Sequence, residues 1–361
     1  MTLLLAATAG LVVLGLVMVL SASSVAAYRA YGSSFLFFVR QLAYAGVGLV
    51  VLLVASRIRY RAWQRLCVPL LVLSGLLLVL VLLPGFGTVA GGSARWLRLG
   101  PVTVQPSELA KLAVVSFVAA LLARRWRRLD DVRQVTMPLV PVGGAICALI
   151  LLQPDMGTTV IIVGAVFVLL FVAGARIRHL VIGGVGLGTL GVGLMAVEGY
   201  RWARVVSFIN PWSDPQGSGY QTIQAAIGLS SGGLFGVGLG AGRQKWSYIP
   251  NAHTDFIFAI IGEELGLAGT ITVLLLFGVL VYAGIRIALR APDTFGRLLA
   301  AGITGWLGIQ ALTNLGAVTG VLPITGVPLP FVSFGGSSLV VSMAGVGILV
   351  AVGRARRTAA R

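Results

Sequence analysis

The chain has 361 residues, of which 58% are hydrophobic and only 10% are charged. Apolar runs of about 20 residues recur along it, and a soluble protein of this length has no core large enough to hide them, so the composition excludes a soluble globular protein. The formal net charge of +17 requires no nucleic-acid partner, because basic residues also gather in the cytoplasmic loops of membrane proteins.

The apolar runs predict an all-α polytopic membrane protein with ten transmembrane helices in a single domain, residues 1–361. The first run has no basic segment before it and is followed by further spans, so we expect an anchor and not a cleaved signal peptide. In chain order the expected spans are residues 3–23, 36–55, 66–84, 107–123, 135–153, 157–174, 179–198, 256–285, 298–319 and 335–352.

The arrangement of basic residues predicts the orientation of these spans. Alternate loops and the C-terminal tail hold 18 of the 27 Lys and Arg residues, and such loops face the cytoplasm in membrane proteins. We therefore expect both termini in the cytoplasm. The basic residues concerned are Arg57, Arg59, Arg61, Arg65, Arg124, Arg125, Arg127, Arg128, Arg133, Arg176, Arg178, Arg286, Arg290, Arg297, Arg354, Arg356, Arg357 and Arg361.

In this orientation residues 199–255 form a large extracytoplasmic loop between spans 7 and 8. Residues 225–242 are rich in Gly, Ser and Leu and too interrupted to cross a bilayer. Irregular backbone at membrane depth is tolerated only where protein surrounds it or where it lines a wet cavity. We therefore expect short or re-entrant helices there, on the outer side of the membrane.

The eighth apolar run, residues 255–285, is too long for one span. A helix of about 31 residues measures roughly 46 Å, against about 30 Å of hydrocarbon, so its outer end must protrude, tilt or break. On a straight helix Glu263 and Glu264 lie near the outer interface, with Asp255 about 12 to 13 Å beyond them. Asp255 is then either a reactive carboxylate at headgroup level or, like Thr254, a residue that caps the helix.

Further candidates on the outer side have a structural and a functional interpretation. Glu108 and Lys111 are three residues apart on one helix face, which favours an ion pair. Trp96, in a loop over residues 91–100, is typical of an interfacial anchor. Arg243 and Lys245 suit either a phosphate ligand or an exposed basic loop, with Pro250 expected to turn the chain toward Asp255. The two histidines lack the spacing of a zinc site, and residues 319–338 contain too many helix breakers for a span.

Four segments together resemble the SEDS family of bacterial cell-wall proteins, which includes FtsW and RodA. They are GGSARWLRLGPVTVQPSELAKL (91–112), LLQPDMGTTV (151–160), NPWSDPQGSGYQTIQAAIGLSSGGLFGVGLGAGRQKWSYIPNAHTDFIFAIIGEELGLAG (210–269) and LTNLGAVTGVLPITGVPLPFVSFGGSSL (312–339). The amino-acid sequence of residues 244–266 resembles the FtsW branch more than the RodA branch, although Asn251 stands where the family pattern has Glu.

The resemblance implies a peptidoglycan glycosyltransferase of cell division that polymerises lipid II at the outer face of the bacterial cytoplasmic membrane, with Asp255 as the catalytic general base. The candidate substrate-binding residues are Arg95, Trp96, Glu108, Lys111, Arg243, Lys245, His253, Thr254, Glu264 and Ser337.

The implied partners are lipid II, undecaprenyl-diphosphate-linked glycan, a class B penicillin-binding protein and other division proteins in the membrane. We expect no tightly bound cofactor or metal, although Mg²⁺ or Mn²⁺ shared with the substrate diphosphate fits the chemistry. Three alternatives remain, namely a lipid II flippase, an elongation polymerase like RodA, and a non-catalytic scaffold of the division machinery. The flippase needs polar groups along a whole transit route, whereas the inner halves of the spans contain almost no acids.

Overall fold

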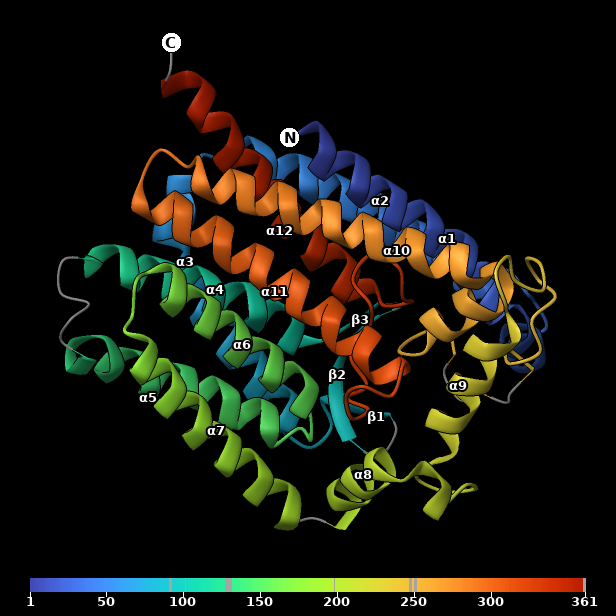
Figure 1. The fold of residues 1–361 in the computed structure, drawn as a ribbon. Coiled ribbons are helices and arrows are strands. Elements are labelled where there is room, and N and C mark those ends of the chain that lie inside the picture. Colours follow the sequence, from blue (N-terminus) through green and yellow to red (C-terminus); the bar gives the residue numbers. More distant parts are fainter. Residues whose placement is uncertain are drawn as a thin grey trace.

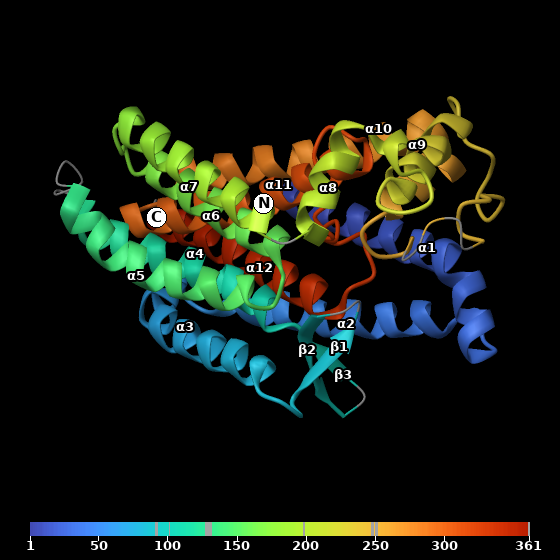
Figure 2. The same ribbon diagram turned by 90° about the horizontal axis from the view of Figure 1, so that it is seen from below.

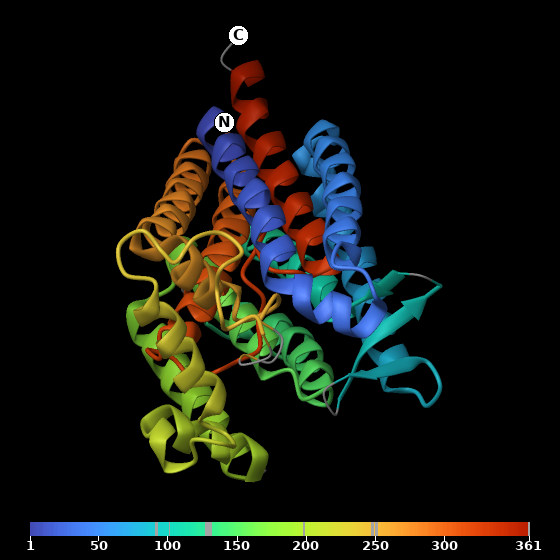
Figure 3. The ribbon, with the colours of Figure 1, turned by 90° about the vertical axis from the view of Figure 1, so that its right-hand side faces the viewer.

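The computed structural model describes residues 1–90, 93–100, 102–126, 132–197, 199–246, 249 and 252–359. Ten long helices form one bundle, and both termini lie at the same end of it (Figures 1 and 3). These helices are α1 (Thr2–Tyr31), α2 (Leu36–Arg57), α3 (Tyr60–Leu82), α4 (Pro106–Arg124), α5 (Val132–Leu151), α6 (Met156–Val172), α7 (Ile177–Val197), α10 (Ile257–Leu289), α11 (Thr294–Val318) and α12 (Gly336–Ala359).

Each expected span coincides with one of these helices, and the mostly helical, multi-pass fold is confirmed. Within the described residues, α1 to α4 and α10 to α12 are long and apolar enough to cross a membrane, while α5, α6 and α7 contain shorter apolar helices. The count of ten spans and their orientation therefore stay predictions. Their placement of both termini on one side agrees with the common end of the bundle (Figure 1).

Helices α4 and α11 form the centre of the bundle. In each of them 78% of an apolar stretch of 18 residues is buried, against 22% in α2. Small residues let the central helices approach closely, as they commonly do in membrane proteins. A Cβ atom on Gly284 of α10 would lie 2.1 Å from the hydroxyl of Thr304 on α11.

A small antiparallel sheet replaces the loop that was predicted for residues 91–100. It consists of β1 (Gly87–Ala90), β2 (Ser93–Leu99) and β3 (Val102–Val104), in the order β1-β2-β3. Leu97 faces Val104 across one pair of strands, and Gly100 supplies the positive φ of 64° at the turn. The loop prediction was wrong because β2 pairs with β1 on one side and with β3 on the other, and the mixed order of polar and apolar residues in SARWLRL does not show the period of two that predicts a strand.

Residues 199–255 contain short helices, as predicted, at the end of the molecule opposite the termini (Figures 1 and 3). They are α8 (Gly199–Ile209), the 3₁₀ turn η2 (Pro211–Ser213) and α9 (Tyr220–Ser231). Seen from below, α8 and α9 lie over the same end of the bundle as the sheet (Figure 2). The irregular loop after α9 leads to α10; Pro250 and Asn251 within it lie outside the described residues.

Helix α10 breaks at Gly266, where φ is 66° and ψ is −160°. Residues 267–289 extend roughly 34 Å and are therefore long enough by themselves to span a bilayer. Residues 257–265 form a separate outer helical segment, and Ile257, Ile260 and Ile261 in it are fully buried. The overlong apolar run is thus resolved by a break, and the height predicted for Asp255 on a straight helix does not apply.

Candidate functional site

Asp255 lies in the turn that leads into the outer segment of α10. The helix cap is Phe256, which offers no side-chain acceptor, so the expectation that Thr254 or Asp255 caps this helix was wrong. The Thr254 hydroxyl instead donates to Oδ1 of Asp255 at 2.9 Å. The Asp255 side chain is half buried, and exposed Gly326 lies beside its Oδ2 atom. A Cβ atom added to Gly326 would lie 3.8 Å from this oxygen. The carboxylate therefore lies at the edge of the protein interior.

Asn314 of α11 fastens this turn to the rest of the molecule. Its Nδ2 donates to the backbone carbonyls of Asp255 and Val327, each at 2.7 Å. The Asn314 side chain is buried, and its Oδ1 has no hydrogen-bond partner in the structure. A buried amide with one satisfied end and one open end is unusual. Asn314 thus joins the turn of Asp255 to the segment that precedes α12.

His253 supports the same turn by packing. Its ring lies against Phe37 of α2 at 4.9 Å and against Phe334 at 5.6 Å between ring centroids, and the Phe334 N–H donates to the His253 carbonyl at 2.9 Å. Burial lowers the pKa of the imidazole to about 4, so the ring is neutral at physiological pH. His253, predicted as a substrate ligand, is placed here as an uncharged packing residue.

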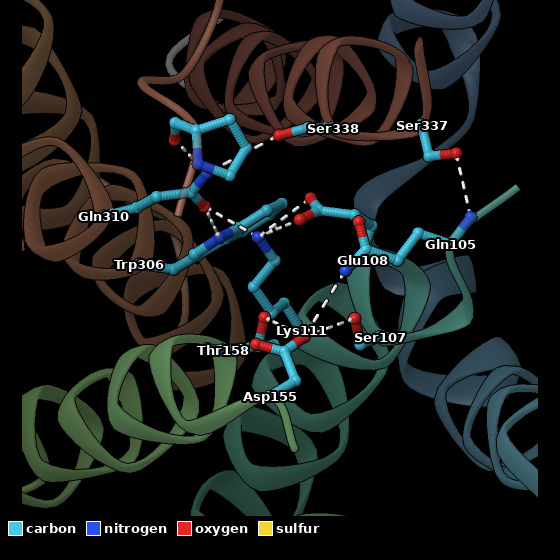
Figure 4. Close-up of polar contacts among 11 residues, drawn as sticks. Gln105, Ser107, Glu108, Lys111, Asp155, Thr158, Trp306, Gln310, Ser337 and Ser338 are labelled. Atoms are coloured by element: carbon cyan, nitrogen blue, oxygen red, sulfur yellow. Dashed lines mark hydrogen bonds and ion pairs between the residues drawn. The ribbon is translucent and has the colours of Figure 1, made fainter. Parts of the chain in front are cut away.

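Glu108 and Lys111 form the expected ion pair, and it is completely buried (Figure 4). The Lys111 ammonium lies 2.8 Å from Oε1 of Glu108 and donates to Oε1 of Gln310 at 2.7 Å. It also lies 5.6 Å from the centre of the Trp306 ring, and the indole N–H donates to the same Gln310 oxygen at 3.0 Å. The charge of Lys111 is therefore matched by a carboxylate, an amide and an aromatic face.

Gln310 connects this pair to the region of Asp255. Its Nε2 donates to the Pro328 carbonyl at 3.0 Å, one residue from the Val327 carbonyl that Asn314 holds. Gln310 and Asn314 are four residues apart on α11 and therefore share one helix face. The sequence analysis missed both; the signal was two amides at helical spacing in an apolar span.

Asp155 organises a second polar cluster beside the ion pair (Figure 4). It caps α6 through the Thr158 N–H and hydroxyl, at 3.1 and 2.8 Å, and accepts from Ser107 and Gln105. The hydroxyl of Ser337, a predicted substrate ligand, accepts from the Gln105 N–H at 3.0 Å. Asp155, which no prediction included, thus ties α4 to α6, and Ser337 ties α12 to the start of α4.

Arg95 and Trp96 of β2 are placed differently from each other. The Arg95 guanidinium donates to the carbonyls of Gln153 at 2.9 Å and of Pro154, so it joins the sheet to the turn between α5 and α6. Trp96 pairs with Thr88 of β1 and is half exposed. Arg95 is committed to backbone carbonyls, whereas Trp96 is partly accessible at the outer end.

Lys245 is buried in an ion pair with Glu264, whereas the sequence suggested an exposed loop or a diphosphate ligand. Its ammonium lies 3.1 Å from Oε1 of Glu264 and also donates to the Gly240 carbonyl and to Ser21 of α1. Glu264 is fully buried and accepts from Ser21 at 2.6 and 2.7 Å. Arg243 differs, because its side chain is exposed. Only Arg243 of the two cations is placed to meet a ligand.

Metal-ligating side chains do not cluster within the described ranges, where no group of three or more His, Cys, Asp and Glu residues could hold an ion. Glu263 and Glu264 use their oxygens on backbone N–H groups, hydroxyls and Lys245. A shared divalent ion near Asp255 stays a prediction.

Comparison with known proteins adds to this geometry. The family model described as cell cycle protein, FtsW/RodA/SpoVE, matches residues 1–358. The stage V sporulation protein E of Bacillus subtilis is 45% identical over 96% of the chain and 95% of its own length. A probable peptidoglycan glycosyltransferase FtsW from Geobacter is 41% identical over 96% of the chain and 94% of its own length.

Solved structures show the same fold. A chain from a study titled as the structural coordination of polymerization and crosslinking by a peptidoglycan synthase complex superposes with a TM-score of 0.80 and 34% identity, covering 98% of this chain and 97% of that one. The rod shape determining protein RodA of Thermus thermophilus gives a TM-score of 0.71 and 32% identity, covering 98% and 96%.

Proposed function

The chain belongs to the FtsW, RodA and SpoVE family of cell cycle proteins, and from this premise we propose that it is a peptidoglycan glycosyltransferase that polymerises lipid II. Relatives that are 41 to 44% identical carry the name probable peptidoglycan glycosyltransferase FtsW. The observation that carries the proposal is the position of Asp255, a half-buried carboxylate beside exposed Gly326 in a turn held by Asn314.

In the proposed reaction Asp255 accepts the proton of the 4-hydroxyl of the acceptor sugar. The hydroxyl oxygen forms a bond to the anomeric carbon of the lipid-linked donor, and the bond from that carbon to the diphosphate oxygen breaks. Undecaprenyl diphosphate leaves with the bonding electrons. A positioned base contributes about 10²- to 10⁴-fold to such a step.

The leaving diphosphate requires positive charge, and exposed Arg243 is our candidate for it. A guanidinium binds phosphate oxygens through two parallel hydrogen bonds. A bound Mg²⁺ or Mn²⁺ would supply further charge, held by diphosphate oxygens and one carboxylate.

The setting we propose is the cytoplasmic membrane during cell division, with the site on its outer face. The FtsW names of several relatives favour division over elongation. The match to a chain of a complex that coordinates polymerization and crosslinking supports a class B penicillin-binding protein as partner. Growing glycan on its undecaprenyl diphosphate carrier is the second substrate.

The test is polymerisation of lipid II by the purified protein, with and without a class B transpeptidase, for the natural chain, Asp255→Asn and Asp214→Asn. Asp214 is an exposed acid of the loop over residues 199–255, and it accepts hydrogen bonds from backbone N–H groups. Its variant is therefore the matched control. We expect long glycan from the natural chain and Asp214→Asn, and at least about a 10²-fold loss for Asp255→Asn. Equal rates for the two variants would refute the base role, and transbilayer movement of lipid II without polymer would favour the flippase.

A further inference from the structure

The loop between α9 and α10 exposes an uninterrupted set of apolar side chains. Residues 232–242 contain no charged residue, and four large side chains stand out from the protein, with Phe235 84% exposed. A surface of this kind marks an interaction site, because water disfavours contiguous apolar area. The other three are Leu234, Val237 and Leu239.

The backbone of this loop is hydrogen bonded inside the protein although it has no regular structure. In the exposed stretch 233–239, the N–H groups of residues 236, 237 and 238 donate to carbonyls of the loop or of α10. In the residues that follow, the N–H groups of 240, 241, 243 and 244 donate to a loop carbonyl or to the carboxylates of Glu263 and Glu264. In return the Leu267 and Ala268 N–H groups donate to the carbonyls of residues 233 and 234. Irregular backbone is tolerated at membrane depth only where protein surrounds it or where it lines a wet cavity, and these bonds attach the loop backbone to the protein.

Two buried charges take part in this arrangement. Glu263 accepts from the N–H groups of Arg243 and Gln244, and Glu264 accepts from that of Gly240 while paired with Lys245. The two carboxylates thus accept hydrogen bonds from the loop backbone, as the carbonyls of a neighbouring strand do in a sheet. Both carboxylates are buried, so neither places a charge on the loop surface.

The loop lies at the level where the spanning part of α10 begins. From Leu267 to the residue before Arg286 the helix rises roughly 28 Å, close to the hydrocarbon thickness of about 30 Å. The hydrogen bonds to residues 267 and 268 therefore hold the loop at the boundary of the hydrocarbon. Exposed Arg29, 6.0 Å from the centre of the Trp246 ring, follows the usual pairing of cations and aromatic residues at headgroup level.

We propose that residues 233–239 insert into the membrane leaflet opposite the termini, outside the ten expected spans, with lipid acyl chains as the partner of the four apolar side chains. Glu263, Glu264 and Lys245 support this insertion, because they bind the backbone of the residues that follow the inserted stretch and because Lys245 and Glu264 neutralise each other inside the protein. The loop then holds the outer segment of α10, and with it the turn of Asp255, at a fixed depth. The inference does not depend on the reaction that the protein catalyses.

The test is the depth of a nitroxide spin label in lipid nanodiscs, measured by relaxation with oxygen and with a water-soluble nickel chelate. Labels are placed at Phe235→Cys and Leu239→Cys in a chain whose two free cysteines are replaced by Ala. The controls are Val50→Cys, on the exposed face of α2, and Gln216→Cys, in the exposed loop after η2.

We expect oxygen to relax the labels at 235 and 239 several-fold more strongly than nickel does, as at position 50, with the reverse at position 216. Nickel-dominated relaxation at both loop positions would overturn the proposal. So would protection from both reagents, since that result means that protein covers the loop. An unchanged thermal midpoint for each labelled variant shows that the fold is intact.

Discussion

Removing the cation of the buried pair on α4 separates a structural role from a substrate-binding role. In Lys111→Met the Glu108 carboxylate stays buried but loses the ammonium 2.8 Å away. Breaking a buried pair from one side costs about 3 to 5 kcal/mol, whereas replacing both partners with apolar residues of similar volume is often neutral. In the double variant Glu108→Leu/Lys111→Met, Gln310 still accepts from the Trp306 indole. We therefore expect the double variant to be more stable than Lys111→Met by about 2 kcal/mol or more.

The measurement is the free energy of unfolding in mixed detergent and SDS micelles, with lipid II polymerisation assayed in parallel. A double variant that regains stability and activity assigns the pair to structure, and one that regains stability alone assigns it to the substrate. Equal destabilisation of the single and double variants would refute the reasoning, because it would mean that the charge of Glu108 is not desolvated.

Three further outcomes follow from the site. Lys245→Gln should lower the thermal midpoint because it leaves Glu264 buried without its cation, whereas Arg243→Gln should slow polymerisation at unchanged stability; a stable but inactive Lys245→Gln would contradict this. Gly266→Ala should cost about 1 to 3 kcal/mol, since its Cβ would lie 2.3 Å from the Gly236 nitrogen, while Gly278→Ala on the open face of α10 should be neutral. The pKa of His253 is lowered to about 4 in the folded protein, so as the pH falls the unfolded chain takes up the proton first. The contribution of neutral His253 to the free energy of unfolding is therefore full above about pH 6.5 and is lost as the pH falls toward 4. Thermal midpoints that track those of His253→Phe between pH 7 and 5 would contradict this.

Local sequence patterns predicted the features that depend on neighbours along the chain. Hydrophobic run length located the ten long helices of the described residues, because a span must satisfy its own backbone in lipid. The three-residue spacing of Glu108 and Lys111 predicted their ion pair, because residues three apart on a helix are neighbours on one face.

Features that depend on distant segments were not predictable in this way. Lys245 finds Glu264 and Ser21 only because the glycine-rich loop folds back over the break at Gly266. The excess length of the run indicated that the end of α10 must protrude, tilt or break, but it did not indicate a break at Gly266, where the backbone closely approaches Gly236. Asn314 looked like an ordinary polar residue in a span until its two carbonyl partners were in place.

The acids at the end of the bundle opposite the termini differ in burial, and this difference favours Asp255 as the proposed base. Glu108, Glu263 and Glu264 are buried, and each is held by an ammonium or by backbone N–H groups of the protein. Burial keeps a substrate hydroxyl away from a carboxylate. Asp255 is half buried beside exposed Gly326, in a turn whose backbone Asn314 holds in place. In the proposed reaction, the fixed backbone positions this carboxylate and its partly exposed side admits the acceptor sugar, whereas burial closes the other three carboxylates to a substrate.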